Sequence, residues 1–510
     1  MRQILGYTLP AFPGGVNYID ATDQLPETDA AELINLYPSG QTLELRKGLE
    51  TSWTAASAPA YTAANLALAD GTSQVVIGSN LSLYKKNGAT STAIKGASTI
   101  TSNEWQHTTF NNRLYLCNGV DNAQIYTGSG NAADISFTGV ATPSIATLIS
   151  VTSYKERIYF IQKNTTKVWY PSSVKAIGTV DLVEFDFSFN LKLGGFLVQH
   201  GSWSSNIGTT TNDLFYVLSS EGELLFYSGL FPGDSSWQIV ARYVIGRPLG
   251  YRAKVHVEND LWIITDRGIV PASMLFQTSG SAAVNSVSRK INKCIEAAAT
   301  NTTFSYLYAA IYNSKDRQVT INLPITNTNT KQIVYNIETN AWTVYQYAVA
   351  GACLSMTMSA STIFYGSNSG KVYAANTGYS DDDLPIQFSL RGGFNFFQRR
   401  GMFKKFVDIR PIIKTIAGDL TLRVDVDTDF RRSIGYATIT APDLGDIGAA
   451  EWDTSAWDVD NWAEDTLYLF QRYSLRGQGH CGALRISGSM LDAPLEFNAF
   501  EIRFEEGGQT

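Results

Sequence analysis

The stretch Asn212-Asp-Leu-Phe-Tyr-Val-Leu, followed by Glu223-Leu-Leu-Phe-Tyr, decides the fold, because three similar stretches accompany it between Asn111 and Leu275. Each has a polar pair, an aromatic-rich strand, a polar turn and a second strand, which predicts a β-hairpin. The copies recur every ~45–57 residues, close to the period of propeller blades. The other three read Asn112-Arg-Leu-Tyr-Leu-Cys with Ala123-Gln-Ile-Tyr, Glu156-Arg-Ile-Tyr-Phe-Ile with Lys167-Val-Trp-Tyr, and Asn259-Asp-Leu-Trp-Ile-Ile-Thr with Gly268-Ile-Val.

Similar hairpins continue on both sides of this region, from Gln74-Val-Val-Ile-Gly to Thr362-Ile-Phe-Tyr-Gly. We therefore predict a β-propeller of about six blades over residues 51–380. Residues 1–50 form an N-terminal arm in this interpretation. Its strand Thr42-Leu-Glu-Leu-Arg-Lys-Gly is expected to complete the last blade and so protect a strand edge.

The composition changes at Ser380-Asp-Asp-Asp-Leu-Pro, where we place a domain boundary. Beyond it the strands are longer and alternate more regularly between apolar and polar residues. They predict a C-terminal β-sandwich over residues 381–510, and an all-β chain. The expected strands are Phe403 to Pro411, Asp419 to Asp427, Leu467 to Leu475, Gly482 to Ile486 and Leu495 to Phe504.

One segment has a helical instead of a strand period. In the segment that begins at Ser288, apolar residues recur at Ile291, Cys294, Ile295 and Ala298. This spacing predicts a short amphipathic helix near residues 288–300, inserted between blades. Its apolar face either packs on the ring of blades or binds a partner.

Composition describes a folded, mildly acidic chain of 510 residues with 44% hydrophobic residues, 17% charged residues and a net charge of −7. Non-specific nucleic-acid binding by charge is not expected. No signal peptide and no membrane-spanning stretch of ~20 apolar residues is expected, which predicts a protein made in a cytoplasm. Scattered cysteines without a C-x-x-C motif indicate free thiols in a reducing compartment: Cys117, Cys294, Cys353 and Cys481.

Several motifs imitate chemical sites. Gly477-Gln-Gly-His-Cys-Gly matches a dinucleotide-binding pattern, but a strand follows it where a helix N-terminus is required. The aspartates at 425, 427 and 429 open like a calcium loop, but Phe430 and Tyr436 replace the required Gly and Glu, so carboxylates on the solvent face of a strand are expected. The four histidines have no metal-ligand spacing. We therefore predict no metal, no cofactor and no catalytic site, although a carboxylate pair assembled in three dimensions stays open.

Two segments are candidate partner-binding sites. The first is the basic run Gln398-Arg-Arg-Gly-Met-Phe-Lys-Lys, where Arg399 and Arg400 either contact DNA phosphates or an acidic partner, or belong to a solvated loop. The second contains Trp452, Trp457 and Trp462, whose spacing of five residues fits neither a helix nor a strand. These indoles either pack within their own loop or form an exposed aromatic interface.

Three pieces of the chain together resemble the tail hub, or nozzle, proteins of short-tailed bacteriophages, a family that includes the packaged-DNA stabilisation protein of the P22-like phages. The first is the arm with Ala31-Glu-Leu-Ile-Asn-Leu-Tyr-Pro and Leu45-Arg-Lys-Gly. The second is Ile264-Thr-Asp-Arg-Gly-Ile-Val-Pro, which leads into the helix at Ser288. The third contains Tyr335-Asn-Ile, Trp342 and Phe497-Asn-Ala-Phe-Glu-Ile-Arg-Phe.

The resemblance implies a structural virion protein, assembled in the bacterial cytoplasm, that forms a homohexameric ring of propellers in the tail. Its implied partners are the head-to-tail adaptor below the portal, a tailspike or tail fibre, and the packaged DNA that it retains until ejection. A receptor- or carbohydrate-binding propeller, similar to a tail-fibre lectin, is the alternative, because indole faces suit sugar stacking. An enzyme built on a propeller is the third hypothesis.

Overall fold

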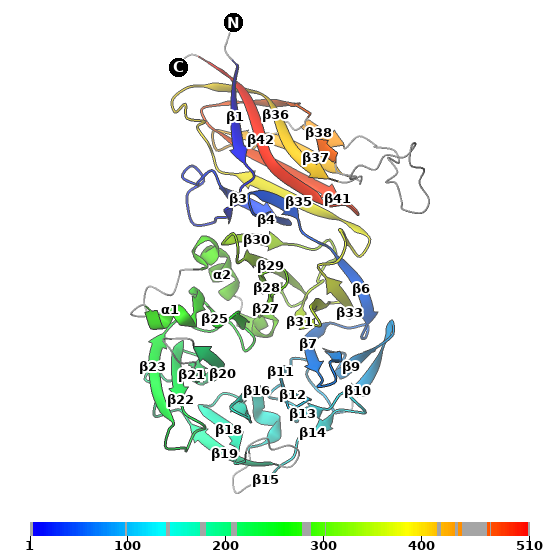
Figure 1. Cartoon of the computed structure of the whole chain (residues 1–510), viewed down its shortest axis with the longest axis vertical. Coiled ribbons are helices and arrows are strands. Elements are labelled where there is room, and N and C mark those ends of the chain that lie inside the picture. Colours follow the sequence, from blue (N-terminus) through cyan, green and yellow to red (C-terminus); the bar gives the residue numbers. More distant parts are fainter. Residues whose placement is uncertain are drawn as a thin grey trace. The chain divides into compact units, whose positions relative to one another are not determined.

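The computed structural model describes residues 4–96, 99–138, 143–173, 180–205, 212–277, 287–300, 302–415, 420–433, 437–440, 467–469 and 471–507. The chain forms two compact units, and nearly all of its regular structure is β-strand (Figure 1). Unit 1 comprises Met1–Glu50, Ile333–Val349 and Asn376–Thr510, and unit 2 comprises Thr51–Gln332 and Ala350–Ala375. Within the described ranges, no helix is long and apolar enough to cross a membrane.

Unit 2 begins with small sheets whose strands follow one another along the chain. The first two sheets contain β7 (Ala60–Ala67), β8 (Ser73–Ser79), β9 (Ser82–Asn87) and β10 (Thr90–Lys95), then β11 (Gln106–Phe110), β12 (Arg113–Cys117), β13 (Gln124–Tyr126) and β14 (Ala133–Asp134). The third contains β15 (Phe137–Thr138), β16 (Leu148–Tyr154), β17 (Arg157–Gln162), β18 (Lys167–Pro171) and β19 (Val180–Asp186).

The remaining sheets of unit 2 repeat the same antiparallel plan. They contain β20 (Leu197–Ser205), β21 (Asn212–Ser219), β22 (Glu223–Ser228) and β23 (Gln238–Val244), then β24 (Lys254–Val257), β25 (Asp260–Thr265) and β26 (Gly268–Pro271). The hairpin of β27 (Ala309–Asn313) and β28 (Gln318–Thr326) follows, and later β31 (Ser355–Ser359), β32 (Thr362–Gly366) and β33 (Lys371–Ala375).

One strand of each sheet, called its central strand here, lies beside the central strand of the next sheet around a common centre (Figure 1). Their order runs from β24 through β27, β31, β7, β11 and β16 to β20, which in turn contacts β25. A ring of small, mostly antiparallel sheets, each contributing one edge strand to the centre, is a β-propeller-like arrangement.

The apolar runs that the sequence repeats are explained by packing on both faces of each sheet. In β21, Phe215 and Val217 pack with Tyr159 of β17, whereas Leu214 and Tyr216 belong to a different core with Leu261 of β25. Successive side chains of a strand point to opposite faces, so a sheet between two neighbours needs apolar residues at every position.

The sheet of β31, β32 and β33 is completed by a strand from the N-terminal part of the chain. β6 (Leu49–Thr54) pairs with β33, and the amide of Ala55 donates a 2.9 Å hydrogen bond to the carbonyl of Gly370. An N-terminal strand therefore closes the ring, but the strand that we expected, Thr42 to Gly48, does not. It contains β5 (Thr42–Leu45), which pairs with β4 (Leu36–Ser39) in unit 1 because its Leu43 and Leu45 are buried there.

Helices are few and short. The helix expected near residues 288–300 is present as a 3₁₀ turn at Arg289–Ile291 followed by α2 (Asn292–Ala299), and it buries Ile291, Ile295 and Ala298. Burial of this face supports packing on unit 2 as its role. In the described ranges the other helical segments are α1 (Ala272–Gln277) and 3₁₀ turns at Ile145–Thr147 and Thr302–Leu307.

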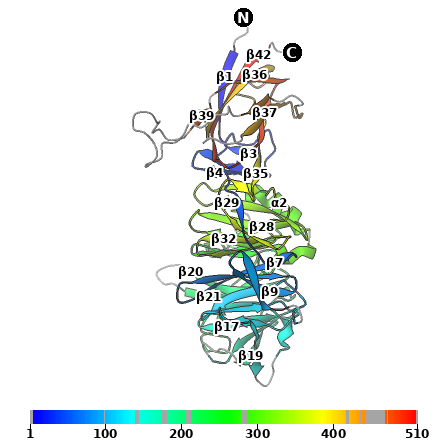
Figure 2. The same cartoon turned by 90° about the vertical axis from the view of Figure 1, so that its right-hand side faces the viewer.

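Unit 1 contains two sheets that face each other (Figure 2). One sheet consists of β1 (Ile4–Pro10), β42 (Leu495–Glu506), β36 (Lys404–Thr415), β39 (Leu467–Leu469), β40 (Tyr473–Gly479), β4 and β5. The other consists of β2 (Gly15–Val16), β3 (Asp29–Ile34), β30 (Ala341–Tyr345), β35 (Leu384–Gly392), β37 (Thr421–Thr428), β38 (Ala437–Thr440) and β41 (Gly482–Met490). β29 (Asn329–Asn336) precedes β30, and the two-residue strand β34 (Ser380–Asp381) precedes β35.

Aromatic side chains fill the space between these two sheets. The rings of Phe388 and Phe497, one from each sheet, have centroids 5.8 Å apart, and Phe12 lies 6.1 Å from Phe500. Four of the five strands expected beyond residue 381 are present as β36, β37, β41 and β42, and the fifth, Leu467 to Leu475, is divided between β39 and β40. Residues 1–50, however, are not a separate arm: β1 pairs antiparallel with β42 from Ile4–Glu505 to Pro10–Ala499, and β3 pairs with β35.

Candidate functional site

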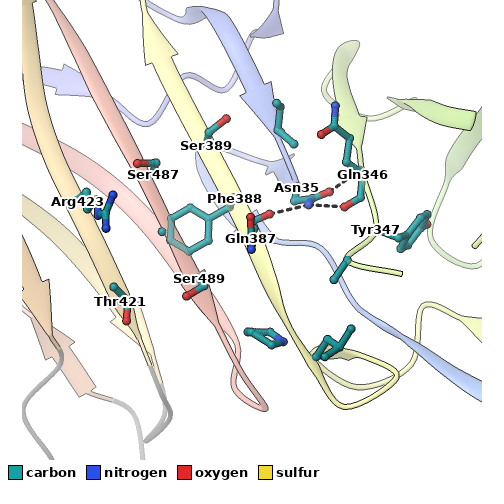
Figure 3. A pocket seen from close by; sticks show the side chains of 15 residues that line it. Asn35, Gln346, Tyr347, Gln387, Phe388, Ser389, Thr421, Arg423, Ser487 and Ser489 are labelled. Atoms are coloured by element: carbon teal, nitrogen blue, oxygen red, sulfur yellow. Dashed lines mark hydrogen bonds between the residues drawn. The ribbon is translucent and has the colours of Figure 1, made fainter. Parts of the chain in front are cut away.

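A polar face of unit 1 is the candidate binding site (Figure 3). β35, β41 and β37 pair side by side, and their outward side chains form rows across all three strands. One row is Gln387, Ser489 and Thr421, and the next is Ser389, Ser487 and Arg423. These residues and the segment 346–348 line a groove of about 830 Å³.

The opposite face of the same strands belongs to the core of unit 1. Phe388 is 3% exposed and covers Gly488, which lies between Phe388 and Leu422 in the strand register. A Cβ on Gly488 would lie 2.2 Å from the carbonyl oxygen of Thr421 and 2.7 Å from the Phe388 ring. Glycine at this position therefore lets the three strands approach closely, which fixes the polar rows on the outer side.

Asn35 holds one edge of the groove (Figure 3). Its Nδ2 donates hydrogen bonds of 2.6 Å to the carbonyls of Gln346 and Gln387, and its Oδ1 accepts one of 2.8 Å from the amide of Gln346. Asn35 is buried and has φ 58°, a conformation that asparagine tolerates better than most residues. The side chain thereby ties the segment at Gln346 to β35.

A buried ion pair lies beside Asn35. Arg46 and Asp381 have fully buried side chains and form a bidentate contact, with Nη1–Oδ1 at 2.8 Å and Nη2–Oδ2 at 2.6 Å. Asp381 Oδ2 also accepts a 2.7 Å hydrogen bond from the amide of Ala348. Two parallel hydrogen bonds between a guanidinium and a carboxylate give geometric specificity as well as energy.

The other donors of Arg46 are satisfied too. Nε donates to Asn35 Oδ1 at 2.8 Å, Nη2 to the carbonyl of Gln346 at 3.0 Å, and Nη1 to the carbonyl of Lys47 at 3.0 Å. The guanidinium lies over the Tyr347 ring, 4.3 Å from its centroid. Burial lowers the pKa of Arg46, but the hydrogen bonds and charge of Asp381 outweigh it, so the pKa lies above its usual value. Arg46 is thus a permanently charged centre that fastens three segments of unit 1.

The groove is equipped for binding by hydrogen bonds. Its lining offers hydroxyl and amide groups, the Tyr347 side chain and the Arg423 guanidinium, and the described lining contains no carboxylate, histidine or cysteine. General acid–base catalysis needs a group that titrates near the working pH. This arrangement therefore suits recognition of a polar ligand or partner more than a reaction.

Arg399 and Arg400 lie in the segment between β35 and β36. The exposed Arg399 pairs with Glu506 at 3.5 Å, and the Arg400 guanidinium lies 4.6 Å from the centroid of the Phe396 ring. Lys404 is completely buried and donates to the carbonyls of Arg399, Met402 and His480 at 2.7–3.0 Å. The lysine orders the loop, and partner binding by the two arginines stays a prediction.

Trp452, Trp457 and Trp462 lie outside the described residues, so their role in partner binding stays a prediction. Among the residues that the structure describes, no cluster of His, Cys, Asp and Glu could hold a metal ion. The four cysteines are free thiols, and burial raises the pKa of Cys117 and Cys353.

The expectation of solvent-facing carboxylates at 425 and 427 is wrong. β37 is a strand as expected, but Asp425 and Asp427 are 4% and 1% exposed. Arg485 Nη2 lies 2.9 Å from Asp425 Oδ2, and its Nε lies 3.3 Å from Asp427 Oδ1. A cross-strand arginine covers both carboxylates, because residues directly opposite on neighbouring strands lie close enough to pair.

The groove itself was not found by sequence reasoning. Two features of the sequence could have indicated the groove. One is the alternation Ile486-Ser-Gly-Ser-Met490 in β41, typical of one apolar and one hydroxyl face, and the other is Arg46, directly after the strand that ends at Leu45. Neither indicates which distant strands lie beside it. Arg46 and Asp381 are 335 residues apart, so only the folded chain shows that they pair.

The chain matches no protein-family model and no curated protein sequence. Similar solved structures include a chain of the mitotic checkpoint complex, with 9% identity and a TM-score of 0.39 over 64% of this chain and 92% of the other. The computationally designed Ika8 protein has 11% identity and a TM-score of 0.36 over 64% and 99%. BBS1N in complex with ARL6DN has 9% identity and a TM-score of 0.39 over 66% and 99%.

Proposed function

We propose that this chain is a structural virion protein: the tail hub, or nozzle, of a short-tailed bacteriophage. In this proposal unit 2 is a β-propeller whose seven sheets, each containing one of the central strands, are its blades, and unit 1 is a β-sandwich. Copies form a homohexameric ring below the portal and adaptor, close the DNA exit channel and carry tailspikes or fibres. The role is assembly and retention of DNA, not catalysis.

The observation that carries this proposal is how both ends of the chain are fastened. β1 pairs with β42 over the register Ile4–Glu505 to Pro10–Ala499, and β6 closes the ring by pairing with β33. A protein that retains pressurised DNA is exposed to force, and survival under force depends on the rate of unfolding. Because β1 is paired with β42 and β6 with β33, neither β1 nor β42 can separate from the fold without breaking hydrogen bonds to the other, and the ring cannot open without breaking those between β6 and β33.

The resemblance to nozzle proteins also includes residues with definite structural roles here. Asn35 and Arg46 belong to the buried network around Asp381, and both lie in the segments that carry the resemblance. Gly48 of the same segment permits a close contact, because a Cβ there would lie 1.8 Å from the carbonyl oxygen of Ser380. These residues support a shared scaffold.

Oligomeric state tests the proposal. Purified full-length protein is measured by size exclusion with light scattering, and imaged by negative stain with and without a phage portal–adaptor complex. A six-fold ring that docks on the adaptor is the expected result. A stable monomer that ignores the complex would overturn the proposal.

A receptor- or carbohydrate-binding protein is the second candidate, favoured by the groove on unit 1. Its rows of amide and hydroxyl groups beside Tyr347 can exchange hydrogen bonds with a polyhydroxylated ligand and offer an aromatic ring for stacking. A glycan array with wild type, Gln387→Ala, Arg423→Ala and Trp457→Ala tests it. Binding lost in the groove variants favours the groove, and binding lost only in Trp457→Ala favours the tryptophan segment. No binding by wild type removes this candidate.

A further inference from the structure

A second cavity lies within unit 2, at the centre of its ring of sheets. It is lined by residues of β11, β16, β20, β24, β27 and β31 and has a volume of about 460 Å³. Each of these is the central strand of its sheet, and its alternate side chains point toward the centre. The cavity therefore collects side chains from most of the ring, and its size suits a small ligand.

The cavity is positively charged although the chain as a whole is acidic. Arg252, in the turn before β24, and Lys254, the first residue of β24, both line it, and the neutral imidazoles of His256 and His107 lie in the same lining. No Asp or Glu is among the described residues that line it. The chain has a net charge of −7, so two neighbouring cations, Arg252 and Lys254, in a lining without Asp or Glu depart from its average.

Arg252 has only carbonyl partners among the described residues. Its Nη2 donates a 3.0 Å hydrogen bond to the carbonyl of Tyr61 and another to the carbonyl of Tyr306. Its Nε is buried and has no hydrogen-bond partner in the described part of the chain. Burial lowers the pKa of Arg252 to about 10, and the charge of Glu104, which does not line the cavity, opposes this only partly.

Lys254 is in a similar position. Its Nζ donates to the carbonyl of His200 and lies 5.5 Å from the centroid of the Tyr216 ring. Burial lowers the pKa of Lys254 to about 8. Neither Lys254 nor Arg252 forms an ion pair with any described carboxylate, and the charge of Glu104, which acts on Arg252, comes from a residue outside the lining of the cavity.

Two half-buried cations side by side without an ion-pair partner are costly. We propose that the central cavity of unit 2 binds a small oxyanion, a phosphate or carboxylate group, between Arg252 and Lys254. Arg252 and Lys254 are two residues apart in the chain and line the same cavity, so their long side chains are within reach of one oxyanion. Hydroxyls of Thr108, Thr152 and Ser202 line the same cavity and supply further donors. This site is independent of the proposed assembly role.

Thermal unfolding of the full-length protein tests the site, with inorganic phosphate, sulfate or acetate replacing chloride at constant ionic strength. The unfolding temperature is expected to rise in a saturable manner, because a ligand that binds only the folded state stabilises it. A larger rise with phosphate and sulfate than with acetate assigns a phosphate group as the natural ligand, and the reverse assigns a carboxylate. No saturable rise with any of the three would overturn the proposal.

Variants locate the effect. Arg252→Gln and Lys254→Met are expected to lose the anion-dependent rise, whereas Arg247→Gln keeps it, because Arg247 is exposed, lies outside the cavity and pairs with Glu221. An equal rise in all three variants would show binding elsewhere. Circular dichroism first establishes that each variant is folded.

The pH dependence of the anion-dependent rise in unfolding temperature is a second measurement. It compares wild type with Lys254→Arg, so it does not require that Arg252→Gln or Lys254→Met folds. Sulfate keeps its charge from about pH 7 to about pH 10, so only the protein titrates. The sulfate effect is expected to weaken above pH about 8 as Lys254 loses its proton, and to persist to higher pH in Lys254→Arg. His107, His200 and His256, whose pKa values burial lowers, stay neutral throughout this range. Identical profiles for both proteins would exclude Lys254 from the site.

Discussion

Replacing Asp381 by Asn removes the charge opposite Arg46 and leaves the shape of the side chain almost unchanged. The guanidinium of Arg46 then stays fully buried with only neutral partners, and the new amide group faces Nη1 or Nη2, which are donors themselves. Both side chains are fully buried, so water cannot replace the lost hydrogen bonds and charge of Asp381.

The magnitude follows from this geometry. Removing one partner of a buried, hydrogen-bonded ion pair costs about 3–5 kcal/mol, because the remaining charge loses its compensation. Arg46→Met should cost a similar amount, since Asp381 is then left buried without its cation. The double variant Arg46→Met/Asp381→Leu should cost far less than the sum of the two single variants, because no charge is left in the core.

Hydrogen exchange measured by mass spectrometry can report this loss locally, which matters because a chain of two units need not unfold in one step. Peptides that contain the amides of Arg46 and Ala348 should exchange about 150- to 4,000-fold faster in Asp381→Asn, the equivalent of about 3–5 kcal/mol. Peptides of β21 in unit 2 serve as an internal reference. Asp383→Asn, which removes the same charge from an exposed neighbour, is the matched control.

Two outcomes would refute this reasoning. One is a change in exchange of less than about tenfold in Asp381→Asn, which would mean that the pair contributes little more than an exposed one. The other is additivity of the two single variants in the double variant, which would show that Arg46 and Asp381 act separately.

Three further predictions concern ring closure, a sheet edge and pH. In denaturant unfolding, Gly370→Ala should destabilise unit 2 by at least ~2 kcal/mol more than Gly71→Ala. Both glycines have positive φ, but of the two only Gly370 would place a Cβ against a carbonyl oxygen, that of Ala56, at 1.6 Å. Equal losses of stability in the two variants would contradict this prediction. Deletion of residues 1–10 should expose the edge of β42 and cause concentration-dependent association in light scattering, and a deletion variant that stays monodisperse would show that the edge is protected otherwise. Burial lowers the pKa of His107 to about 4, so the neutral imidazole contributes its full share to the free energy of unfolding above pH about 6.5, and this share of up to ~3 kcal/mol is lost as the pH falls toward about 4. The free energy of unfolding of His107→Gln should therefore depend less steeply on pH than that of wild type, and parallel curves for the two proteins would rule out this role.

The sequence indicates the repeated unit of unit 2, but it reveals only the two strands of each sheet that are apolar on both faces. The quoted hairpins are the two strands that follow the central strand of each sheet, such as β21 and β22, which are apolar on both faces because neighbouring sheets cover them. Central strands such as β11, Gln106–Phe110, face the central cavity and are polar, and fourth strands such as β23 are largely exposed. These strands lack the apolar signal on which the hairpin prediction depends.

The two ends of the chain were harder to place for a different reason. The alternating strands beyond residue 381 were found because each has one apolar face, but which strands pair is decided by contacts over hundreds of residues. Thr42–Leu45 and Leu49–Thr54 are both short strands, and only the burial of Leu43 and Leu45 in unit 1 shows which of them reaches β33. The groove likewise needs three strands that lie far apart in sequence.

Closure of the ring by β6 has a consequence for synthesis of the chain. β6 leaves the ribosome roughly 320 residues before its partner β33, an interval of about 16–64 s at common rates of translation. During this time an unpaired strand and an incomplete ring coexist in each nascent chain. Neighbouring chains on one messenger could then exchange this strand, so that slow release from the ribosome would yield linked rings in place of closed ones.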